Sequence, residues 1–340
     1  MDHPMPATNS ASAGARPTPP LTQAPPTPAA QQVEIKRVMP EGPLVDIMGG
    51  AQRLECRVHT HGFIALVDVM PRLVPEGQTA DAAVVQAARV SYGQGTKKVS
   101  EDRGLIRYLM RHRHTTPFEM VEVKFHVAMP IFVARQWIRH RTANVNEYSA
   151  RYSIMPDRFY TPTIEEVRKQ SASNRQGGEE RFNTGTGDEA RTAEEFLTYL
   201  KDVEAAYQRY LGLTEQGVSR EMARIGLPVN IYTEWYWKCD LHNTMRFLGL
   251  RLDPHAQSEI RDYAQAMAAL LEPIAPASME AFRDYEMESV RLTRLEVDAL
   301  RAELAGGTGG DSGTPSPLAT DNRREQAEWE AKRARLGFPA

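Results

Sequence analysis

The chain has 340 residues, of which 41% are hydrophobic and 25% charged, so most of it is able to build a buried core. A formal net charge of −3 and a pI of 6.3 argue against general affinity for nucleic acid, and any anion site must therefore be local. No apolar run approaches the roughly 20 residues that a membrane helix needs, and residues 1–32 lack the pattern of a signal peptide, so we expect a cytoplasmic protein.

Residues 1–32 are rich in Pro, Ala, Ser and Thr and are predicted to form a disordered tail. The patterns that follow predict, in chain order, a strand over 62–70, helices over 79–92 and 100–114, a strand over 118–129, a helix over 131–140, a polar loop or insertion over 168–190, a helix over 188–217, a strand over 230–238, and helices over 240–252 and 254–271. Thr79 and Ser100 stand at the expected N-caps of the first two helices. This mixture predicts an α+β fold, with helices packed against a small, mainly antiparallel sheet.

The C-terminal part differs in composition. Residues 305–322 are rich in Gly and Ser and are predicted to be a flexible linker. Residues 323–340 have dense mixed charge, which is typical of a solvated helix or a frayed tail. The globular domain is therefore predicted over residues 52–304.

Positive charge concentrates in one stretch, RQWIRHRTANVNEYSARYS, which spans residues 135–153. The face of its helix that is predicted to be core carries Ile131, Ala134 and Ile138. Arg135 and Arg139 share a second face, with Gln136 one turn before Arg139. A solvated basic face is one interpretation of this pattern, and an anion site is the other.

Ser149 and Arg151 follow this helix and lie on the same side of the chain if the chain is extended there. Guanidinium groups bind phosphate through two parallel hydrogen bonds, and a Ser hydroxyl completes such a cradle. Asn144 and Asn146 add amide groups that are able to read hydrogen-bonding edges, and Glu147 is a lone acid among the arginines. The cluster therefore predicts a phosphate site for a small nucleotide.

The helix predicted over 240–252 carries a second group of polar residues. Its predicted core seam consists of Leu241, Met245, Leu248 and Leu252. Its two flanks are predicted to carry Asp240, Phe247 and Arg251 on one side, and His242 and Arg246 on the other. One helix is thus able to face two ligands.

At this point the sequence resembles a known family. Arg139-His140-Arg141, seven residues and then Ser149 match the RHR-x7-S signature of the flavin-dependent thymidylate synthases. The blocks AARVSY, HTTPFEM, NEYSARYS, RIGLPVNIYTEWYW and NTMRFLGLRLDPHAQSEIR are also similar to that family and stand in family order. The resemblance covers roughly residues 55 to 285, and it implies the flavin-dependent thymidylate synthase fold for the domain over 52–304.

The resemblance also implies an activity. Members of the family bind FAD, take a hydride from NADPH, and use methylenetetrahydrofolate to methylate dUMP to dTMP. They are homotetramers in which several subunits build each active site. We therefore expect FAD as cofactor, NADPH and methylenetetrahydrofolate as co-substrates, and no nucleic-acid or membrane partner.

Carried onto this sequence, the resemblance implies specific site residues. The dUMP contacts would be Gln136, Arg139, Glu147, Tyr148, Ser149, Ala150, Arg151, Arg224 and Arg251. The FAD contacts would be Thr116, Arg139, His140, Arg141, Glu147, Asp240, Leu241, His242 and Arg246. His114 would lie near the flavin and the folate, and Arg251 matches the catalytic arginine that is held to polarise the uracil ring. Thr116 stands where Ser is frequent, and Arg246 stands where members carry Asn or His.

Two residues raise the possibility of covalent chemistry. Ser149 would need an adjacent base to act as a nucleophile, and no His lies at a telling position beside it, so binding is favoured. Cys239 lies in YWKCDLHN, where no neighbour would activate a thiolate, and we expect a buried structural thiol. Cys239 and Cys56 are far apart in the sequence, and both are expected to be reduced.

The sequence disfavours a metal site and several kinds of nucleotide site. His112 and His114 sit at a helix end, so no metal site is expected. Trp235 and Trp237 alternate in a predicted strand and are expected in the core or at a subunit interface. The absence of Gly-rich nucleotide motifs disfavours a Rossmann or P-loop site. A nucleic-acid-binding protein is the rival class, which the acidic balance and the lack of a reader motif disfavour.

Overall fold

The computed structural model describes residues 44–47, 53–90, 102–171, 177–306 and 318–338. The predicted tail over 1–32, the predicted cap Ser100 and most of the predicted linker lie outside these ranges. The strands are β1 Leu44–Asp46, β2 Leu54–Val58, β3 Gly62–Met70, β4 Leu73–Pro75, β5 Glu122–Pro130, β6 Asn144–Glu147, β7 Arg168–Gln170, β8 Gly178–Arg181 and β9 Tyr232–Asp240. The α-helices are α1 Asp81–Val90, α2 Asp102–Arg111, α3 Ile131–Trp137, α4 Asp188–Glu204, α5 Ala206–Glu215, α6 Arg220–Ala223, α7 Leu241–Arg251, α8 Ser258–Leu271, α9 Pro276–Phe282, α10 Arg294–Gly306 and α11 Arg323–Arg335. Within the described ranges, no helix is both long and apolar enough to cross a membrane.

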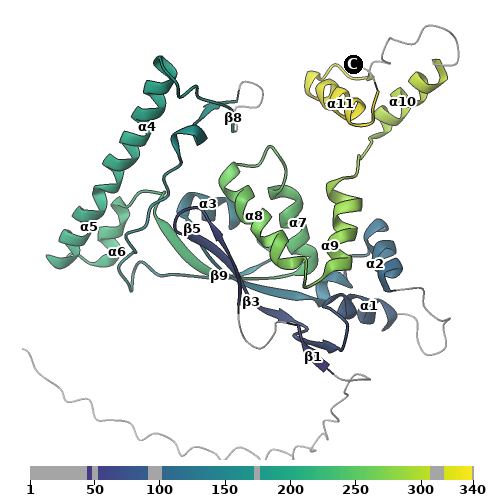
Figure 1. Cartoon of the computed structure of the whole chain (residues 1–340), viewed down its shortest axis with the longest axis horizontal. Coiled ribbons are helices and arrows are strands. Elements are labelled where there is room, and N and C mark those ends of the chain that lie inside the picture. The colour runs from purple at the N-terminus through teal and green to yellow at the C-terminus, as the bar shows by residue number, and fades with distance from the viewer. Residues whose placement is uncertain (1–43, 48–52, 91–101, 172–176, 307–317, 339–340) are drawn as a thin grey trace, which may run out of the picture. The chain divides into compact units, whose positions relative to one another are not determined.

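A five-stranded antiparallel sheet forms the centre of the described fold, in the strand order β2-β3-β5-β9-β6. Helices α3, α7 and α8 lie over one face of this sheet (Figure 1). The predicted alternation in β5 is confirmed, because Val123, Phe125 and Val127 are buried while the polar residues between them are only partly buried. Helices on an antiparallel sheet confirm the predicted α+β fold.

Trp137, the last residue of α3, lies at the centre of the packing between helices and sheet. Its ring is fully buried and stacks on Phe247 of α7, with ring centroids 4.7 Å apart. Trp235 and Trp237 of β9 meet it edge-on at 5.8 and 6.0 Å, so both belong to the core. Such aromatic pairs add about 0.5–1.5 kcal/mol each beyond the buried area. Phe247, predicted on the flank of the helix that also carries Arg251, is fully buried, because Trp137 of α3 covers it.

Helix α3 ends earlier than predicted. The chain tightens after Trp137, where the amide of His140 donates to the carbonyl of Trp137 at 3.0 Å. This tighter turn moves Ile138 off the core face, and the predicted core residue is 41% exposed. Ile131 is only partly buried, and the buried face of α3 carries Val133, Ala134 and Trp137.

Two element starts also differ from the prediction. The strand predicted from Phe118 begins at Glu122, because residues 118–120 form a short 3-10 helix, η1 (Phe118–Met120). The helix predicted from Pro254 begins at Ser258. Before it, Asp253 folds the chain into a turn by accepting bonds from the amides of the second and third residues after it.

The region between β6 and β9 is more structured than the predicted loop and single helix. Strands β7 and β8 pair as a hairpin inside the predicted loop over 168–190. The predicted helix over 188–217 is divided at Ala205 into α4 and α5. The described part of this region also contains two short 3-10 helices, η2 (Ile164–Glu166) and η3 (Arg224–Gly226).

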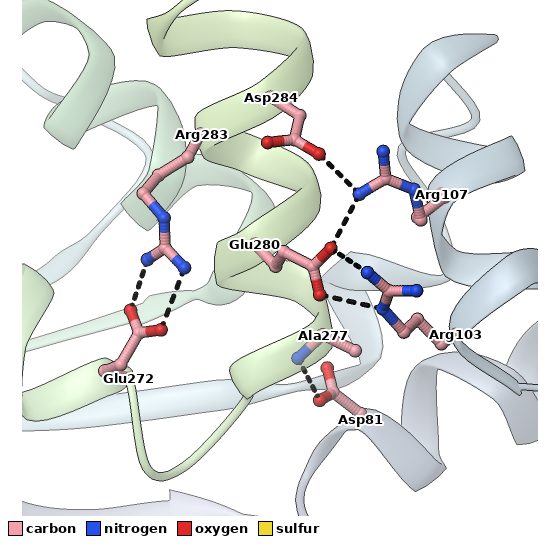
Figure 2. Close-up of polar contacts among 8 residues, drawn as sticks. All are labelled: Asp81, Arg103, Arg107, Glu272, Ala277, Glu280, Arg283 and Asp284. Atoms are coloured by element: carbon pink, nitrogen blue, oxygen red, sulfur yellow. Dashed lines mark hydrogen bonds and ion pairs between the residues drawn. The ribbon is translucent and has the colours of Figure 1, made fainter.

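Ion pairs hold α2 against α9 (Figure 2). Arg107 donates to Glu280 at 2.8 Å and to Asp284 at 2.5 Å, and Arg103 donates from Nε to Glu280 at 2.9 Å. A π-helical turn, η4 (Arg283–Met287), continues α9. Because α2 leads directly to His114, these pairs fix the origin of the loop that carries that residue.

Asp81, the first residue of α1, caps the start of α9. Its carboxylate accepts bonds from the amides of Ala277 and Ser278 at 2.8 and 3.0 Å, and the contact to Ala277 is drawn in Figure 2. Thr79, the predicted N-cap, lies two residues before α1, and its hydroxyl donates to the same carboxylate at 3.2 Å instead of accepting a helix amide. The start of one helix thus caps another.

Helices α10 and α11 pack against each other. Their apolar cluster consists of Ala299, Leu318 and Trp329. Trp329 is 3% exposed, and Arg333 beside it donates to Glu303 through two bonds of 3.1 and 2.6 Å. The segment over 323–340, predicted as a solvated helix or a frayed tail, is therefore a helix with one buried face in its described part.

Candidate functional site

The ends of α3 and α7 meet at Arg251, the last residue of α7. Its Nε donates to Nε2 of His140 at 3.1 Å, and its Nη2 donates to the carbonyl of Gln136 at 3.3 Å. Gln136 lies in the last turn of α3, and His140 lies three residues after the end of that helix. The fold thus brings together three of the residues that the sequence predicted, and the other N–H groups of Arg251 have no hydrogen-bond partner among the described residues.

The electrostatics of this junction keep His140 neutral. Burial, together with the positive charges of Arg251 and Arg246, lowers the pKa of His140 to about 4. Because its Nε2 accepts a bond from Arg251, the ring proton of the neutral form lies on Nδ1. Burial also lowers the pKa of Arg251, but a guanidinium keeps its charge at neutral pH. The junction is therefore a cation held by neutral acceptors.

Four more arginines near this junction have no acidic partner among the described residues. Arg135, Arg139, Arg141 and Arg246 are exposed. None of them forms an ion pair with an acidic side chain of the described residues. Guanidinium groups without carboxylate partners suit an anionic ligand, but a solvated basic face would have the same exposure, so both interpretations of the sequence stay open here.

The predicted phosphate loop begins at the end of β6. Glu147 is paired with β9, and its carboxylate accepts the hydroxyl of Thr233 at 2.8 Å. Tyr148 closes the loop, because its hydroxyl donates to the carbonyl of Ile154 at 2.7 Å. Ala150 is partly buried in a small apolar cluster that includes Met155, Tyr207, Tyr210, Ala223 and Ile231.

Ser149 and Arg151 follow in the same loop, where Ser149 is partly buried and Arg151 is exposed. The hydroxyl of Ser149 accepts the amide of Arg151 at 3.3 Å. Arg151 donates from Nε to Glu221 of α6 at 2.7 Å, and Arg220 donates to the carbonyl of Tyr152 at 2.6 Å. No sequence signal pointed to Glu221, whose partner is 70 residues away. The partly buried Arg224 follows α6 directly, at the start of η3.

The other end of α7 holds the remaining residues predicted for FAD. Asp240 caps the helix by accepting the amide and the side-chain Nδ2 of Asn243, each at 2.8 Å. Leu241 is fully buried, and its amide donates to the carbonyl of Val121. His242 is partly buried and Thr116 is exposed. Neither side chain has a hydrogen-bond partner among the described residues.

His114 is exposed at the end of the loop that follows α2. Its ring lies edge-on to Tyr108 with centroids 5.8 Å apart, and His112 lies 4.4 Å from the same tyrosine. These rings form an exposed aromatic group, which suits contact with a planar ligand. Within the described ranges, no group of three or more His, Cys, Asp or Glu residues has a metal-binding arrangement.

The structure supports neither Cys239 nor Ser149 as a nucleophile. Cys239 is 2% exposed, and burial raises the pKa of its thiol to about 12, which disfavours the thiolate at neutral pH. The hydroxyl of Ser149 contacts the Arg151 amide and no imidazole in the described structure. A hydroxyl without a base is a poor nucleophile, so binding is the better interpretation of Ser149.

A cavity of about 880 Å³, which the sequence did not predict, lies between the β7–β8 hairpin, α4 and the turn before α8. Phe132 of α3 and Gln257 line it. Gln136, one turn after Phe132, donates from its side-chain Nε2 to Oε1 of Gln257. The cavity and the Arg251 junction are therefore neighbours along one face of α3. Gln257 lies in the AQSEIR block, but no sequence signal pairs it with Gln136.

Known proteins are similar to this chain over most of its length. Residues 72–277 match the family model described as thymidylate synthase complementing protein. A flavin-dependent thymidylate synthase from Dictyostelium discoideum is 61% identical over 308 residues, which cover 91% of this chain and 95% of that protein. One from Gluconobacter oxydans is 50% identical over 284 residues, covering 82% and 89%. A crystal structure of PolB, a UMP/dUMP methylase from Streptomyces cacaoi bound with 5-Br UMP, is similar with a TM-score of 0.56 and 33% identity, over 68% of this chain and 97% of that chain.

Proposed function

Because the chain belongs to the flavin-dependent thymidylate synthases and is an enzyme of that family, we propose that it binds FAD and methylates dUMP to dTMP, with NADPH as reductant and methylenetetrahydrofolate as one-carbon donor. The observation that carries this proposal is the Arg251 junction. A partly buried guanidinium is held there by an imidazole and a carbonyl, and no carboxylate pairs with it among the described residues. Its charge therefore remains available to a substrate.

Arg251 has a defined task in the proposed reaction. Methylation requires electrons to move toward the carbon that receives the methyl group and a proton to leave the ring. A fixed positive charge beside the pyrimidine stabilises the negative charge that develops on the ring. Gln136, whose carbonyl helps to hold Arg251, is proposed to contact the same nucleotide with its amide side chain.

The phosphate of dUMP is assigned to the exposed cations. Arg139 and Arg151 would bind it, with the hydroxyl of Ser149 beside them and Arg224 also in contact with the nucleotide. Their exposure supports this assignment for the two phosphate arginines, because a phosphate dianion remains partly hydrated when bound at such a surface. We propose that the phosphate replaces Glu221 at Nε of Arg151 when it binds.

The residues proposed for FAD fit an anionic dinucleotide. Arg139, Arg141 and Arg246 are exposed and have no described carboxylate partner, which suits a pyrophosphate. Asp240 fits less well as a side-chain contact, because Asn243 occupies both of its carboxylate oxygens. When bound, FAD would supply the hydride chemistry, and the chain would supply placement and electric field.

We also propose that the enzyme is a cytoplasmic homotetramer with shared active sites. This proposal rests on the family resemblance, which implies four copies and active sites built from several of them. Gel filtration combined with light scattering tests the tetramer directly.

The activity is tested with the purified full-length protein. A flavin absorbance spectrum, retained or taken up on adding FAD, is the first expected result. Anaerobic NADPH oxidation is then measured with and without dUMP, followed by detection of dTMP after methylenetetrahydrofolate is added. A colourless protein that takes up no flavin, or a flavoprotein that forms no dTMP, would contradict the proposal.

A further inference from the structure

We propose that His140 is a positioning residue, which acts on the reaction by holding the Arg251 guanidinium toward the pyrimidine. This role is separate from the flavin contact that family resemblance implies for the same side chain. It rests on the proposed function of Arg251. The geometry that carries it is the 3.1 Å bond from Arg251 Nε to His140 Nε2 and the 3.3 Å bond from Nη2 to the Gln136 carbonyl.

These two bonds fix the plane of the guanidinium. One acceptor lies in the last turn of α3 and the other in the tight turn that follows it, and they engage two different nitrogens of Arg251. A guanidinium is planar, so two bonds to a rigid support define where its remaining N–H groups point. The Nη1 group and the second hydrogen of Nη2 have no described hydrogen-bond partner and are free to bind a carbonyl of the substrate.

The support is rigid because the core holds the imidazole. The ring of His140 meets Phe247 edge-on, with centroids 4.8 Å apart. Phe247 is itself fully buried and stacked on Trp137. Loss of the ring would therefore free the Arg251 side chain on its Nε side, while the Gln136 carbonyl would remain.

The acceptor also has to be neutral. A carboxylate at this position would hold Arg251 but would cancel the charge that the pyrimidine needs. The charged groups that act on the imidazole are Arg246 and Arg251 of α7, and its chain neighbours Arg139 and Arg141 are exposed cations as well. These surroundings disfavour the imidazolium, so the ring remains an acceptor throughout the neutral pH range.

Replacement of His140 by two different residues tests the role. The amide of Gln places an acceptor oxygen near the position of Nε2, whereas Leu provides no acceptor. We expect His140→Leu to lower turnover per bound flavin by about tenfold or more, the scale of one hydrogen bond to a charged group. The Kd of dUMP should change much less. His140→Gln should recover turnover to within about threefold of the wild type, and His61→Gln, an exposed histidine on the β2–β3 turn, is the matched control.

A double-mutant cycle with Arg251→Ala shows whether His140 acts through Arg251. If it does, adding His140→Leu to Arg251→Ala should change turnover per bound flavin by less than about twofold. Additive losses, or a loss in His140→Leu that disappears once FAD is saturating, would overturn this inference while leaving the proposed function intact. Wild-type turnover in Arg251→Ala itself would instead overturn the proposed role of Arg251, and this inference with it.

Discussion

Removal of Glu221 should tighten the binding of dUMP, although Glu221 makes a hydrogen-bonded ion pair in the structure. Its carboxylate lies 2.7 Å from Nε of Arg151, and the two side chains are 54% and 55% exposed. We assign Arg151 to the dUMP phosphate and propose that the phosphate displaces this carboxylate from Nε. An exposed ion pair contributes about 0.2–1 kcal/mol, and Glu221→Gln should therefore lower the Kd of dUMP by about 1.5- to 5-fold.

The assay is a titration of the FAD-loaded enzyme with dUMP, followed through the flavin absorbance at low and high salt. The gain in affinity should shrink as salt screens the exposed charges. Glu215→Gln is the matched control, because Glu215 is an exposed acid at the end of α5 with no described ion-pair partner. Arg151→Ala should weaken binding and abolish the effect of Glu221→Gln.

The opposite result would refute this reasoning. If Glu221→Gln weakens dUMP binding at full flavin occupancy, the carboxylate does not compete with the phosphate but orients Arg151 to receive it. An equal effect in Arg151→Ala would show that Glu221 acts on the nucleotide by another route.

Four further outcomes are expected. Arg251→Ala should lower turnover by about a hundredfold or more, because it removes a group that stabilises developing charge, while flavin content is retained and dUMP affinity changes little. Steady-state kinetics measure the turnover, and equilibrium binding measures the dUMP affinity. Cys239→Ser should keep turnover within about threefold in the same assay, because the buried thiol is not used as a thiolate. The free energy of unfolding should fall as pH drops from 6.5 toward about 4, since the unfolded His140 binds a proton there and the folded one does not; urea unfolding of His140→Gln should show a flatter pH profile. Trp329→Ala should destabilise the packing of α11 on α10 by about 3 kcal/mol, seen as faster proteolysis after α10, while turnover is retained.

Hydrophobic periodicity predicted many of the helices and strands, because these elements depend mainly on residues close together in the sequence. The alternation in β5 and β9 and the helix α7 reflect the geometry of single elements, and the structure has each of them near its expected place. The signature from Arg139 to Ser149 is local too. Family resemblance named His140 and Arg251 as site residues, but it did not predict that the two would be paired.

The pairings themselves come from distant parts of the chain. Ile138 was expected in the core by helical periodicity, but the helix ends at Trp137, three residues before its predicted end, and the tighter turn exposes Ile138. Phe247 was expected on a flank beside the core seam of its helix, and the ring that covers it comes from α3. The bonds of Arg251 to His140 and of Arg151 to Glu221 join residues 111 and 70 positions apart in the sequence. Helix and strand periodicity relates only near neighbours and therefore did not predict these pairs.

The two arginine settings differ in a way that matches the two parts of a nucleotide. Arg151 is exposed and lies beside a carboxylate, a partner that a phosphate dianion is able to replace at small cost because the pair is weak in water. Arg251 is partly buried and is held by an imidazole and a carbonyl, which fix its geometry without neutralising it. A carboxylate would bind Arg251 more strongly at that partly buried position. It would also reduce the positive potential at the pyrimidine ring, whose negative charge develops only during the reaction. A phosphate carries its charge at all times and needs an exchangeable partner, whereas a pyrimidine needs a cation whose charge is still available when the proton leaves.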